Sequence, residues 1–198
     1  GPDFILVNDP QGHRGFLELI FRAALTRRER TQPKWLARYH PQRGYGIFAR
    51  AAISAGETIL PFENQPHHLA QLDQVLESWP PEQQRLFERH AYPLSDETWV
   101  VPYEDLTRWT PLRHACDPNA WWQGLNIVAR REIAAGEEIT LDSATYHNEL
   151  MPEFTCDCES PDCRKTIRGS DYLQPFVARY GDHVTEYVRM RRRQEHTG

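Results

Sequence analysis

The sequence predicts a mostly β fold with helical additions, which places the chain in the α+β class. Short apolar segments recur between turns rich in Gly and Pro, a pattern typical of short strands joined by tight connections. Helical patterns are confined to the beginning, the middle and the end of the chain. They do not alternate with the strands, as they would in a doubly wound parallel sheet.

The composition fits one folded domain with additions at its ends. The chain has 198 residues, of which 39% are hydrophobic and 26% are charged, and this balance favours a packed core over disorder. The formal net charge is −5, which argues against a general nucleic-acid binder because such proteins carry a basic surface. No apolar run approaches the roughly 18 residues of a membrane span. No secretory segment is visible either, so we expect a cytoplasmic protein.

The chain begins with a predicted helix and continues as strands. Residues 16–30 place apolar side chains at helical spacing and end in arginines, which suit the negative end of a helix dipole. Strands are then predicted over three segments: 35–40, 45–49 and 57–62. The first turn covers 41–44. Gly44 at its end and Gly46 in the next strand lack side chains and so let the backbone approach a ligand closely. On its own, Gly-x-Gly between strands is usually only a tight turn.

The middle of the chain, residues 65–108, predicts two helices followed by a strand. The first helix has one apolar face, formed by Leu69, Leu72, Leu76 and Trp79. Pro81 suits the first turn of a second helix, which continues to His90. A strand is predicted at 99–102.

The remainder of the chain predicts two strand regions and a helical tail. The strand regions are 121–128 and 138–141, and an Ala135-Gly136 turn precedes the second. Residues 173–193 place apolar side chains at helical spacing and predict one or two helices. We interpret the arginines that end this segment as a solvated tail rather than a binding patch.

All four cysteines lie in one region, and their spacing predicts a zinc site. Cys156, Cys158 and Cys163 form a C-x-C-x4-C run, and Cys116 stands beside a Pro-Asn turn. Structural zinc takes four ligands in a tetrahedron, so Cys116 would complete the set that the run begins. The alternatives are two disulfides or plain buried thiols. The missing secretory segment disfavours disulfides.

Three separated groups of motifs resemble one known family. In chain order they are Arg43–Ala49 with Ile53-x-x-Gly56-Glu57, then His114-x-Cys116-Asp117-Pro118-Asn119 with Gly136–Asp142, and last the C-x-C-x4-C run. Their order and spacing resemble a SET domain with its post-SET cysteines, over about 35–163. The segment 166–172 is similar to the tail of small bacterial-type SET lysine methyltransferases.

The resemblance implies a SET-type β-clip fold in four parts. These are an N-terminal helical extension over 1–34, a SET-like domain over 35–150 with an insert at about 65–108, a post-SET zinc loop over 151–168, and a C-terminal helical tail over 169–198. In this family the insert helps to form the substrate groove. The candidate groove residues are therefore His90, Tyr92, Trp99 and Tyr103, with core aromatics and one surface histidine as the alternative.

The resemblance also implies S-adenosylmethionine as the cofactor. In the family the Gly-x-Gly turn lies against the methionine part of this cofactor through its backbone. The candidate cofactor-binding residues are Gly44, Tyr45, Gly46, Arg113, His114 and Phe154, of which Phe154 would cover the adenine. Zn²⁺ is expected to be structural, because four thiolates leave no open position on the metal. Its expected ligands are Cys116, Cys156, Cys158 and Cys163.

The sequence departs from the family pattern where the chemistry is expected. The family usually places a tyrosine hydroxyl at the methyl-transfer centre, and the corresponding residue here is Ser143. Tyr146 follows shortly after and is the first candidate for this role, with Ser143 the second. Arg113 replaces the asparagine that usually precedes the histidine. Its guanidinium could grip a carboxylate of the cofactor or of the substrate.

Three functions follow as hypotheses. The favoured one is an S-adenosylmethionine-dependent N-methyltransferase directed at a protein lysine. The second is a SET-fold enzyme that acts on a free amino acid or another small-molecule amine, which the changes at Arg113 and Ser143 motivate. The third is a non-catalytic SET-fold binding protein, which the loss of the usual tyrosine motivates. No membrane or nucleic-acid partner is expected, and the oligomeric state does not follow from the sequence.

Overall fold

The computed structural model describes residues 18, 21–22, 32–41, 44–101 and 111–195. The chain divides into two units, Gly1–Pro33 and Lys34–Gly198, and the strands and helices named below lie in the second. The predicted helix over 16–30 lies outside the described residues except at Glu18, Phe21 and Arg22, which are helical. Tyr103 also lies outside them, and the division into four parts stays a prediction. Among the described helices, none has the length and apolar character needed to span a membrane.

The described elements are mostly short strands. The strands are β1 (Trp35–His40), β2 (Gly44–Ala49), β3 (Thr58–Leu60), β4 (His68–Gln71), β5 (Tyr92–Pro93), β6 (Thr98–Val101), β7 (Arg113–His114), β8 (Ala120–Gln123), β9 (Asn126–Ala129), β10 (Glu138–Leu141), β11 (Phe154–Thr155) and β12 (Thr166–Ile167). The α-helices are α3 (Leu72–Ser78), α4 (Pro81–His90) and α5 (Glu186–Glu195), and the 3₁₀ helices are η1 (Phe62–Asn64), η2 (Ser143–Thr145), η3 (Gly169–Leu173) and η4 (Pro175–Tyr180).

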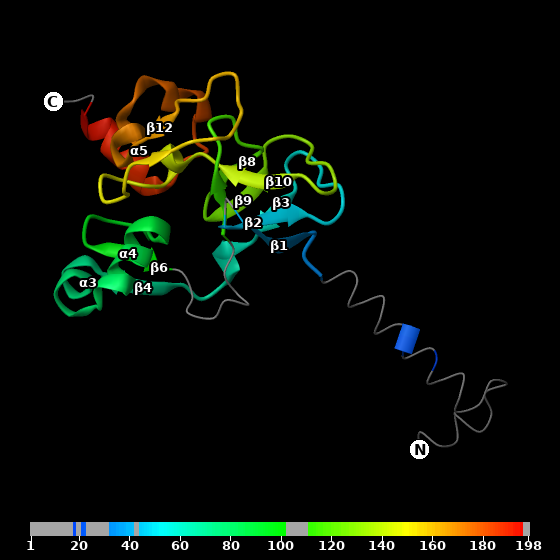
Figure 1. Cartoon of the computed structure of the whole chain (residues 1–198), viewed down its shortest axis with the longest axis horizontal. Helices are drawn as coiled ribbons and strands as arrows, with labels where there is room; N and C mark the ends of the chain where they lie inside the picture. Colours follow the sequence, from blue (N-terminus) through cyan, green and yellow to red (C-terminus); the bar gives the residue numbers. More distant parts are fainter. Residues whose placement is uncertain (1–17, 19–20, 23–31, 42–43, 102–110, 196–198) are drawn as a thin grey trace, which may run out of the picture. The chain divides into compact units, whose positions relative to one another are not determined.

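Two small sheets share the main hydrophobic core (Figure 1). One has the order β1-β2-β10-β7 and the other β3-β9-β8. All their pairings are antiparallel except that of β10 with β7, which is parallel. The fully buried side chains of this core include Ile47, Ile53, Ile127, Ile133, Ile139 and Leu141. The predicted α+β class, many short strands with few helices, is confirmed.

Two matching turns join the sheets. Ile53 and Ile133 exchange backbone hydrogen bonds of 2.9 Å in both directions. Each is followed by a turn with a glycine at positive φ, +79° for Gly56 and +86° for Gly136, a conformation that other residues adopt only with strain. In each turn the glutamate after the glycine accepts a hydrogen bond from a backbone N–H three residues earlier. The two Ile-x-x-Gly-Glu segments of the sequence therefore form turns with the same structure.

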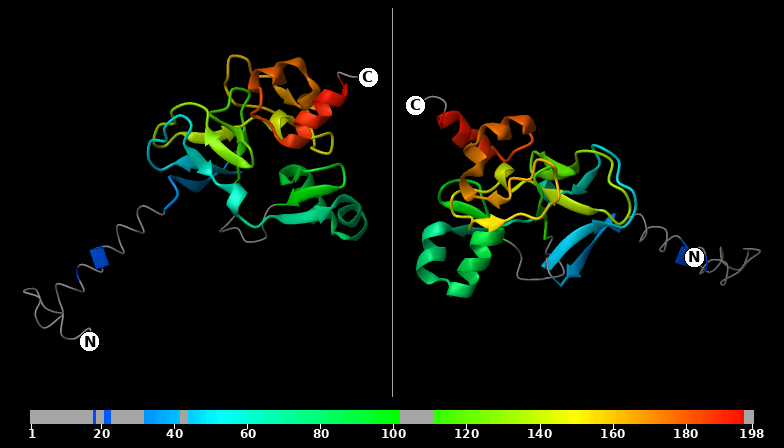
Figure 2. Two further views of the ribbon diagram at one scale, coloured as in Figure 1. Left: turned by 180° about the vertical axis from the view of Figure 1, so that it is seen from behind. Right: turned by 45° about the horizontal axis from the view of Figure 1, so that its top comes forward.

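The insert folds around its own small core (Figure 2). Its sheet has the order β4-β6-β5, and Val75, Phe87 and Trp99 are buried between that sheet and the helices α3 and α4. Pro81 begins α4, as predicted. The single helical face predicted from Leu69 to Trp79 is wrong at its start. Residues 68–71 pair with β6 instead, because Ala70 fits the buried face of this sheet while Leu69 faces solvent.

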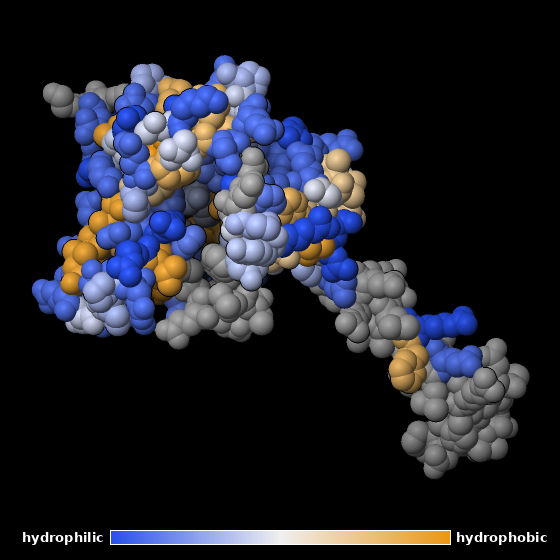
Figure 3. Space-filling view, in the orientation of Figure 1, coloured by the Kyte–Doolittle hydropathy of each residue, from blue (hydrophilic) through white to orange (hydrophobic). Residues whose placement is uncertain are grey.

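The surface of the insert is partly apolar. Leu69, Leu76 and Leu86 are each more than half exposed. The space-filling view shows hydrophobic surface over the same part of the molecule (Figure 3).

The predicted strand region 121–128 is a hairpin of β8 and β9. Gly124, at φ +60°, lies in its turn. In the predicted helical tail only α5 is an α-helix, while η3 and η4 are 3₁₀ helices, the second starting at Pro175. Their apolar side chains form a second core with Ala144 of η2: Tyr172, Val177, Tyr180, Val184, Tyr187 and Val188. The C-terminal segment therefore supports the turn that follows β10.

Candidate active site and metal site

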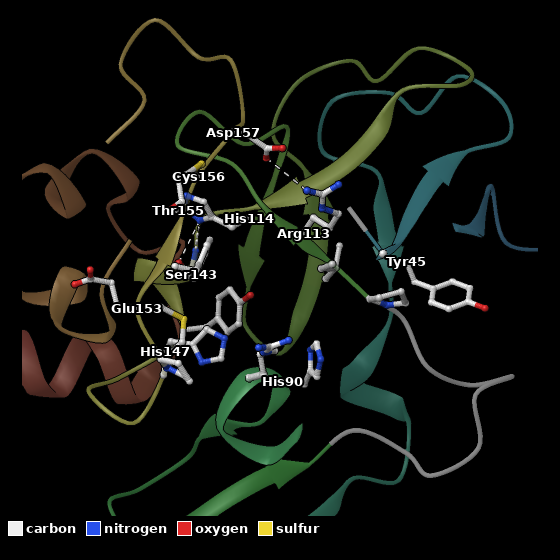
Figure 4. A pocket seen from close by; sticks show the side chains of 18 residues that line it. Tyr45, His90, Arg113, His114, Ser143, His147, Glu153, Thr155, Cys156 and Asp157 are labelled. Carbon is white, nitrogen blue, oxygen red and sulfur yellow. Dashed lines mark hydrogen bonds and ion pairs between the residues drawn. The ribbon is translucent and has the colours of Figure 1, made fainter. Parts of the chain in front are cut away.

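A cavity of about 560 Å³ opens where the start of β2, the end of α4, β7, η2 and the segment around β11 meet (Figure 4). It gathers nearly all of the residues that the sequence singled out for the cofactor and the chemistry: Gly44, Tyr45, Arg113, His114, Ser143, Tyr146 and Phe154. Gly46 is the exception, since it does not line the cavity. The parallel register of β7 with β10 explains much of this arrangement. It sets His114 opposite Leu141, so the η2 turn begins beside the histidine ring.

His114 is held by hydrogen bonds at both ring nitrogens. Its Nδ1 accepts a hydrogen bond of 3.1 Å from the backbone N–H of Ser143, and its Nε2 lies 3.3 Å from Sγ of Cys116. Burial lowers the pKa of His114 to about 4, against an opposing effect of Asp142, so the ring is neutral near pH 7. We assign the proton to Nε2, which then donates to the sulfur. His114 therefore links the cavity to the cysteine cluster.

The two candidate catalytic residues differ in what their hydroxyls contact. Oγ of Ser143 lies 3.2 Å from Nδ1 of His114, and the side chain is buried. Tyr146 lines the cavity, and its hydroxyl forms no hydrogen bond with the residues that the structure describes. Its ring packs against Trp122 and Tyr92, with centroids 5.8 and 6.4 Å away. Burial raises the pKa of Tyr146 well above its ordinary value, so the hydroxyl stays protonated.

Arg113 lies between two carboxylates. Its guanidinium is 3.7 Å from Oε1 of Glu138 and 3.6 Å from Oδ1 of Asp157, and Figure 4 shows Asp157 reaching across to it. A Cβ on Gly46 would collide with the Glu138 carboxylate. Gly46, which lies in β2, therefore makes room for this ion-pair group, a role that the sequence pattern did not indicate.

The two predicted aromatic contacts to the cofactor lie differently. The ring of Tyr45 is half exposed, packs against Tyr39 at 5.1 Å and points away from the other labelled side chains (Figure 4). Phe154, from β11, meets the ring of His114 edge-on at 5.6 Å. Phe154 therefore contributes its ring to the cavity, and Tyr45 lies at its margin.

The end of the cavity formed by α4 carries one arginine and two histidines. Arg89 and His90, the last residues of α4, line it together with His147. Burial lowers the pKa of His147 to about 3, and the charges that His90 and His114 would carry act in the same direction. Sequence reasoning found His90 as a groove candidate but missed Arg89 and His147. Tyr92 packs behind Tyr146, and Trp99 is a core residue of the insert.

The four cysteine sulfurs form one cluster. All four Sγ atoms lie within 4.8 Å of one another, and those of Cys116 and Cys156 are 3.9 Å apart. Zinc–sulfur bonds of about 2.3 Å in a tetrahedron place sulfurs roughly 3.8 Å apart, so the donor set fits zinc. Backbone N–H groups of Arg164 and Cys116 point at the sulfurs of Cys116 and Cys158, at 3.3 and 3.4 Å. Such contacts suit thiolates.

A buried carboxylate lies behind the η2 turn. Asp142 is fully buried. Its carboxylate accepts hydrogen bonds from both terminal nitrogens of Arg164 and from the hydroxyl of Tyr180, each at 2.7 Å. Burial alone would raise the pKa of Asp142, but the hydrogen bonds from Arg164 and Tyr180 and the charges of Arg164 and His114 together outweigh it, and the pKa is lowered. The sequence holds one signal for this pair: an Asp directly after the predicted strand 138–141 and an Arg directly after the last cysteine.

Known proteins match the same part of the chain. Residues 44–142 match the family model described as SET domain. The variant-silencing SET domain-containing protein of Plasmodium falciparum (isolate 3D7) is 25% identical over 130 residues, covering 61% of this chain and 5% of that protein. Histone-lysine N-methyltransferase SET9 of Gibberella zeae is 33% identical over 89 residues, covering 40% of this chain and 13% of that protein.

The chain thus spans a small part of the length of these curated relatives. The family match takes in half of the chain, from Gly44 at the start of β2 to Asp142, directly after β10. It includes β7 and β10, whose parallel pairing builds the cavity. This chain therefore belongs to the SET-domain family.

Proposed function

We propose that this chain is an S-adenosylmethionine-dependent N-methyltransferase that acts on the side-chain amine of a protein lysine. One observation carries the proposal. A single cavity brings together the Gly44 turn, His114 and Phe154 beside Tyr146, whose hydroxyl has no hydrogen-bond partner among the described residues. The similarity to a protein named as a histone-lysine N-methyltransferase supports the same substrate class.

The cavity suits the proposed cofactor. A volume of about 560 Å³ lies within the range of sites for cofactors and other small ligands, and its lining joins backbone at Gly44 with apolar side chains at Leu112, Met151 and Phe154. When bound there, S-adenosylmethionine would supply an electrophilic methyl group. Gly44 and Tyr45 would hold its methionine part, and Phe154 would cover its adenine. The zinc held by the cysteines is proposed to be structural.

Methyl transfer requires a neutral amine held in line with the methyl group. Orientation can remove roughly 7–11 kcal/mol of such a barrier. A lysine amine of pKa about 10.4 must lose a proton, which costs roughly 4.6 kcal/mol at pH 7. Burial of the amine and the positive charge of a nearby sulfonium would both lower that cost, because each favours the neutral amine over the charged one. Tyr146 remains protonated in this site, so its oxygen would orient the amine rather than act as a strong base.

A small acidic substrate is the second candidate, and Arg89 is the observation that favours it. The guanidinium of Arg113 is already placed between Glu138 and Asp157. Arg89 also lines the cavity, and its guanidinium forms no hydrogen bond or ion pair with the residues that the structure describes. A carboxylate on a free amino acid would find a bidentate partner there.

One labelling experiment separates these functions. The zinc-loaded protein is incubated with methyl-labelled S-adenosylmethionine and host lysate, and the products are divided into protein and small-molecule fractions. Label in protein supports the lysine methyltransferase. Label only in small molecules supports the second candidate. No label in either fraction, from folded and zinc-loaded protein, would overturn both and favour a non-catalytic binding protein.

A further inference from the structure

Asp142 ties three separate segments of the chain together. Asp142 directly follows β10. Its carboxylate accepts hydrogen bonds from the guanidinium of Arg164, in the cysteine loop (residues 151–168), and from the hydroxyl of Tyr180, in η4. Its side chain is fully buried. A buried carboxylate is stable only when it is paired and hydrogen-bonded, so these partners decide where it sits.

Arg164 is fixed by the metal site on one side and by Asp142 on the other. It directly follows Cys163, and its backbone N–H donates to Sγ of Cys116 at 3.3 Å. Its guanidinium makes a two-pronged contact with Asp142, with both distances 2.7 Å, and lies over the ring of Phe176 at 4.3 Å. A second carboxylate, that of Asp171, is 3.3 Å from its Nε. These contacts therefore hold the Arg164 side chain in one position while the four cysteine sulfurs are clustered.

Asp142 in turn sets the η2 turn. Its Oδ1 accepts a hydrogen bond from the N–H of Ala144, and its backbone oxygen accepts both the N–H and the hydroxyl of Thr145. The N–H of Tyr146 then bonds to the backbone oxygen of Ser143. A change in the Asp142 carboxylate therefore moves the turn that carries both candidate catalytic residues.

We propose that Arg164 is a positioning residue through which the zinc-loaded cysteine loop holds the η2 turn, and with it Tyr146, in its working geometry. The chain of contacts runs from the sulfur cluster through Arg164 to Asp142 and then to the turn. This proposal rests on the proposed methyltransferase function for its catalytic meaning. Its structural part stands apart from it, since ordering of the turn by the metal can be measured without any turnover.

The first test is amide hydrogen exchange of residues 143–147 in the full chain, with zinc and after chelation. Exchange about tenfold faster without zinc is expected, because the turn opens locally once Arg164 is released. The zinc-loaded Arg164→Gln protein should show the same fast exchange while keeping its zinc. The control is Arg168→Gln, which removes an exposed arginine that is paired with Glu153 at the end of the cysteine loop. This variant should exchange like the wild type.

The second test separates kcat from KM. Arg164→Gln should lower kcat for methyl transfer about tenfold, because Tyr146 is displaced from the reacting atoms, with KM for the cofactor within a factor of about 3. Arg164→Lys should recover part of the loss, since it keeps the charge but not the two-pronged contact. If Arg164→Gln does not fold, the hydrogen exchange and kcat of Arg164→Lys test the proposal instead.

Wild-type exchange and wild-type kcat in zinc-loaded Arg164→Gln, or in Arg164→Lys where the Gln variant is unfolded, would overturn the proposal. Exchange in the wild type that does not respond to chelation would overturn it as well. A wild-type protein that transfers no methyl group would overturn the proposed function instead. In that case the exchange measurements alone still decide whether Arg164 couples the metal site to the turn.

Discussion

The imidazole of His114 accepts a hydrogen bond from the backbone N–H of Ser143 at 3.1 Å, with the Ser143 hydroxyl 3.2 Å from the same nitrogen. The residue at the family's usual catalytic position is thus turned toward the histidine. Tyr146 lies on the cavity wall, and its hydroxyl forms no hydrogen bond with the described residues. The geometry therefore favours Tyr146 over Ser143 for the proposed contact with the substrate amine.

Tyr146→Phe should lower kcat by about 100-fold, the usual cost of deleting one oriented polar group at a reacting centre. The ring contacts with Trp122 and Tyr92 remain, so the affinity for S-adenosylhomocysteine should not change. Ser143→Ala should cost less than about tenfold, because the backbone N–H still holds His114. The measurement is steady-state methyl transfer, with calorimetry for binding. A wild-type kcat in Tyr146→Phe would remove this residue from the chemistry.

The cysteine cluster should hold about one zinc ion per chain. Cys158→Ser should lose that metal and unfold at lower temperature, since binding a structural metal is coupled to folding. Metal analysis and thermal unfolding, each with and without a chelator, check both parts. The chelator should destabilise the wild type but have no further effect on Cys158→Ser. Equal zinc content in the two proteins would show that Cys158 is not a ligand.

The sequence predicted those parts of the site whose residues lie in short local motifs. The cysteine spacing, the Gly44 turn and the His114 segment each have a fixed pattern, and the structure gathers them. Pairing across long separations was not visible. The strand at 68–71 forms because Ala70 fits a sheet completed by Trp99, and the Asp142–Arg164 pair joins residues that are 22 apart.

Gly46→Ala should destabilise the protein by less than about 1 kcal/mol, because the new Cβ collides only with the end of the flexible Glu138 side chain, which can shift away. Gly44→Ala provides the comparison. Gly44 has φ +74° but open space at its Cβ, so its cost of about 1–2 kcal/mol is backbone strain alone. Urea unfolding measures both. Gly46→Ala should also disturb Arg113, which is paired with Glu138, and so weaken binding of S-adenosylhomocysteine. Binding by Gly46→Ala as tight as that of the wild type would contradict this expectation.

His147 should make the fold sensitive to acid. Its pKa falls from the ordinary 6.5 to about 3 in the native protein, chiefly through burial. Between these values the unfolded chain binds a proton at this residue and the native chain does not. The free energy of unfolding must therefore fall as the pH falls through this window, by at most about 1.4 kcal/mol per pH unit for one group. Above pH 6.5 this contribution is fully present and constant.

His147→Phe should flatten that dependence, because it keeps a ring against Tyr146, 4.4 Å away in the native protein, but cannot bind a proton. Urea unfolding between pH 4.5 and 7 tests this, with the free energy of unfolding plotted against pH. His68→Phe, at an exposed position on β4, controls for the loss of one imidazole elsewhere. Acid also releases zinc from thiolates, but this acts equally in all three proteins. A His147→Phe slope as steep as that of the wild type would show that another group carries the acid sensitivity.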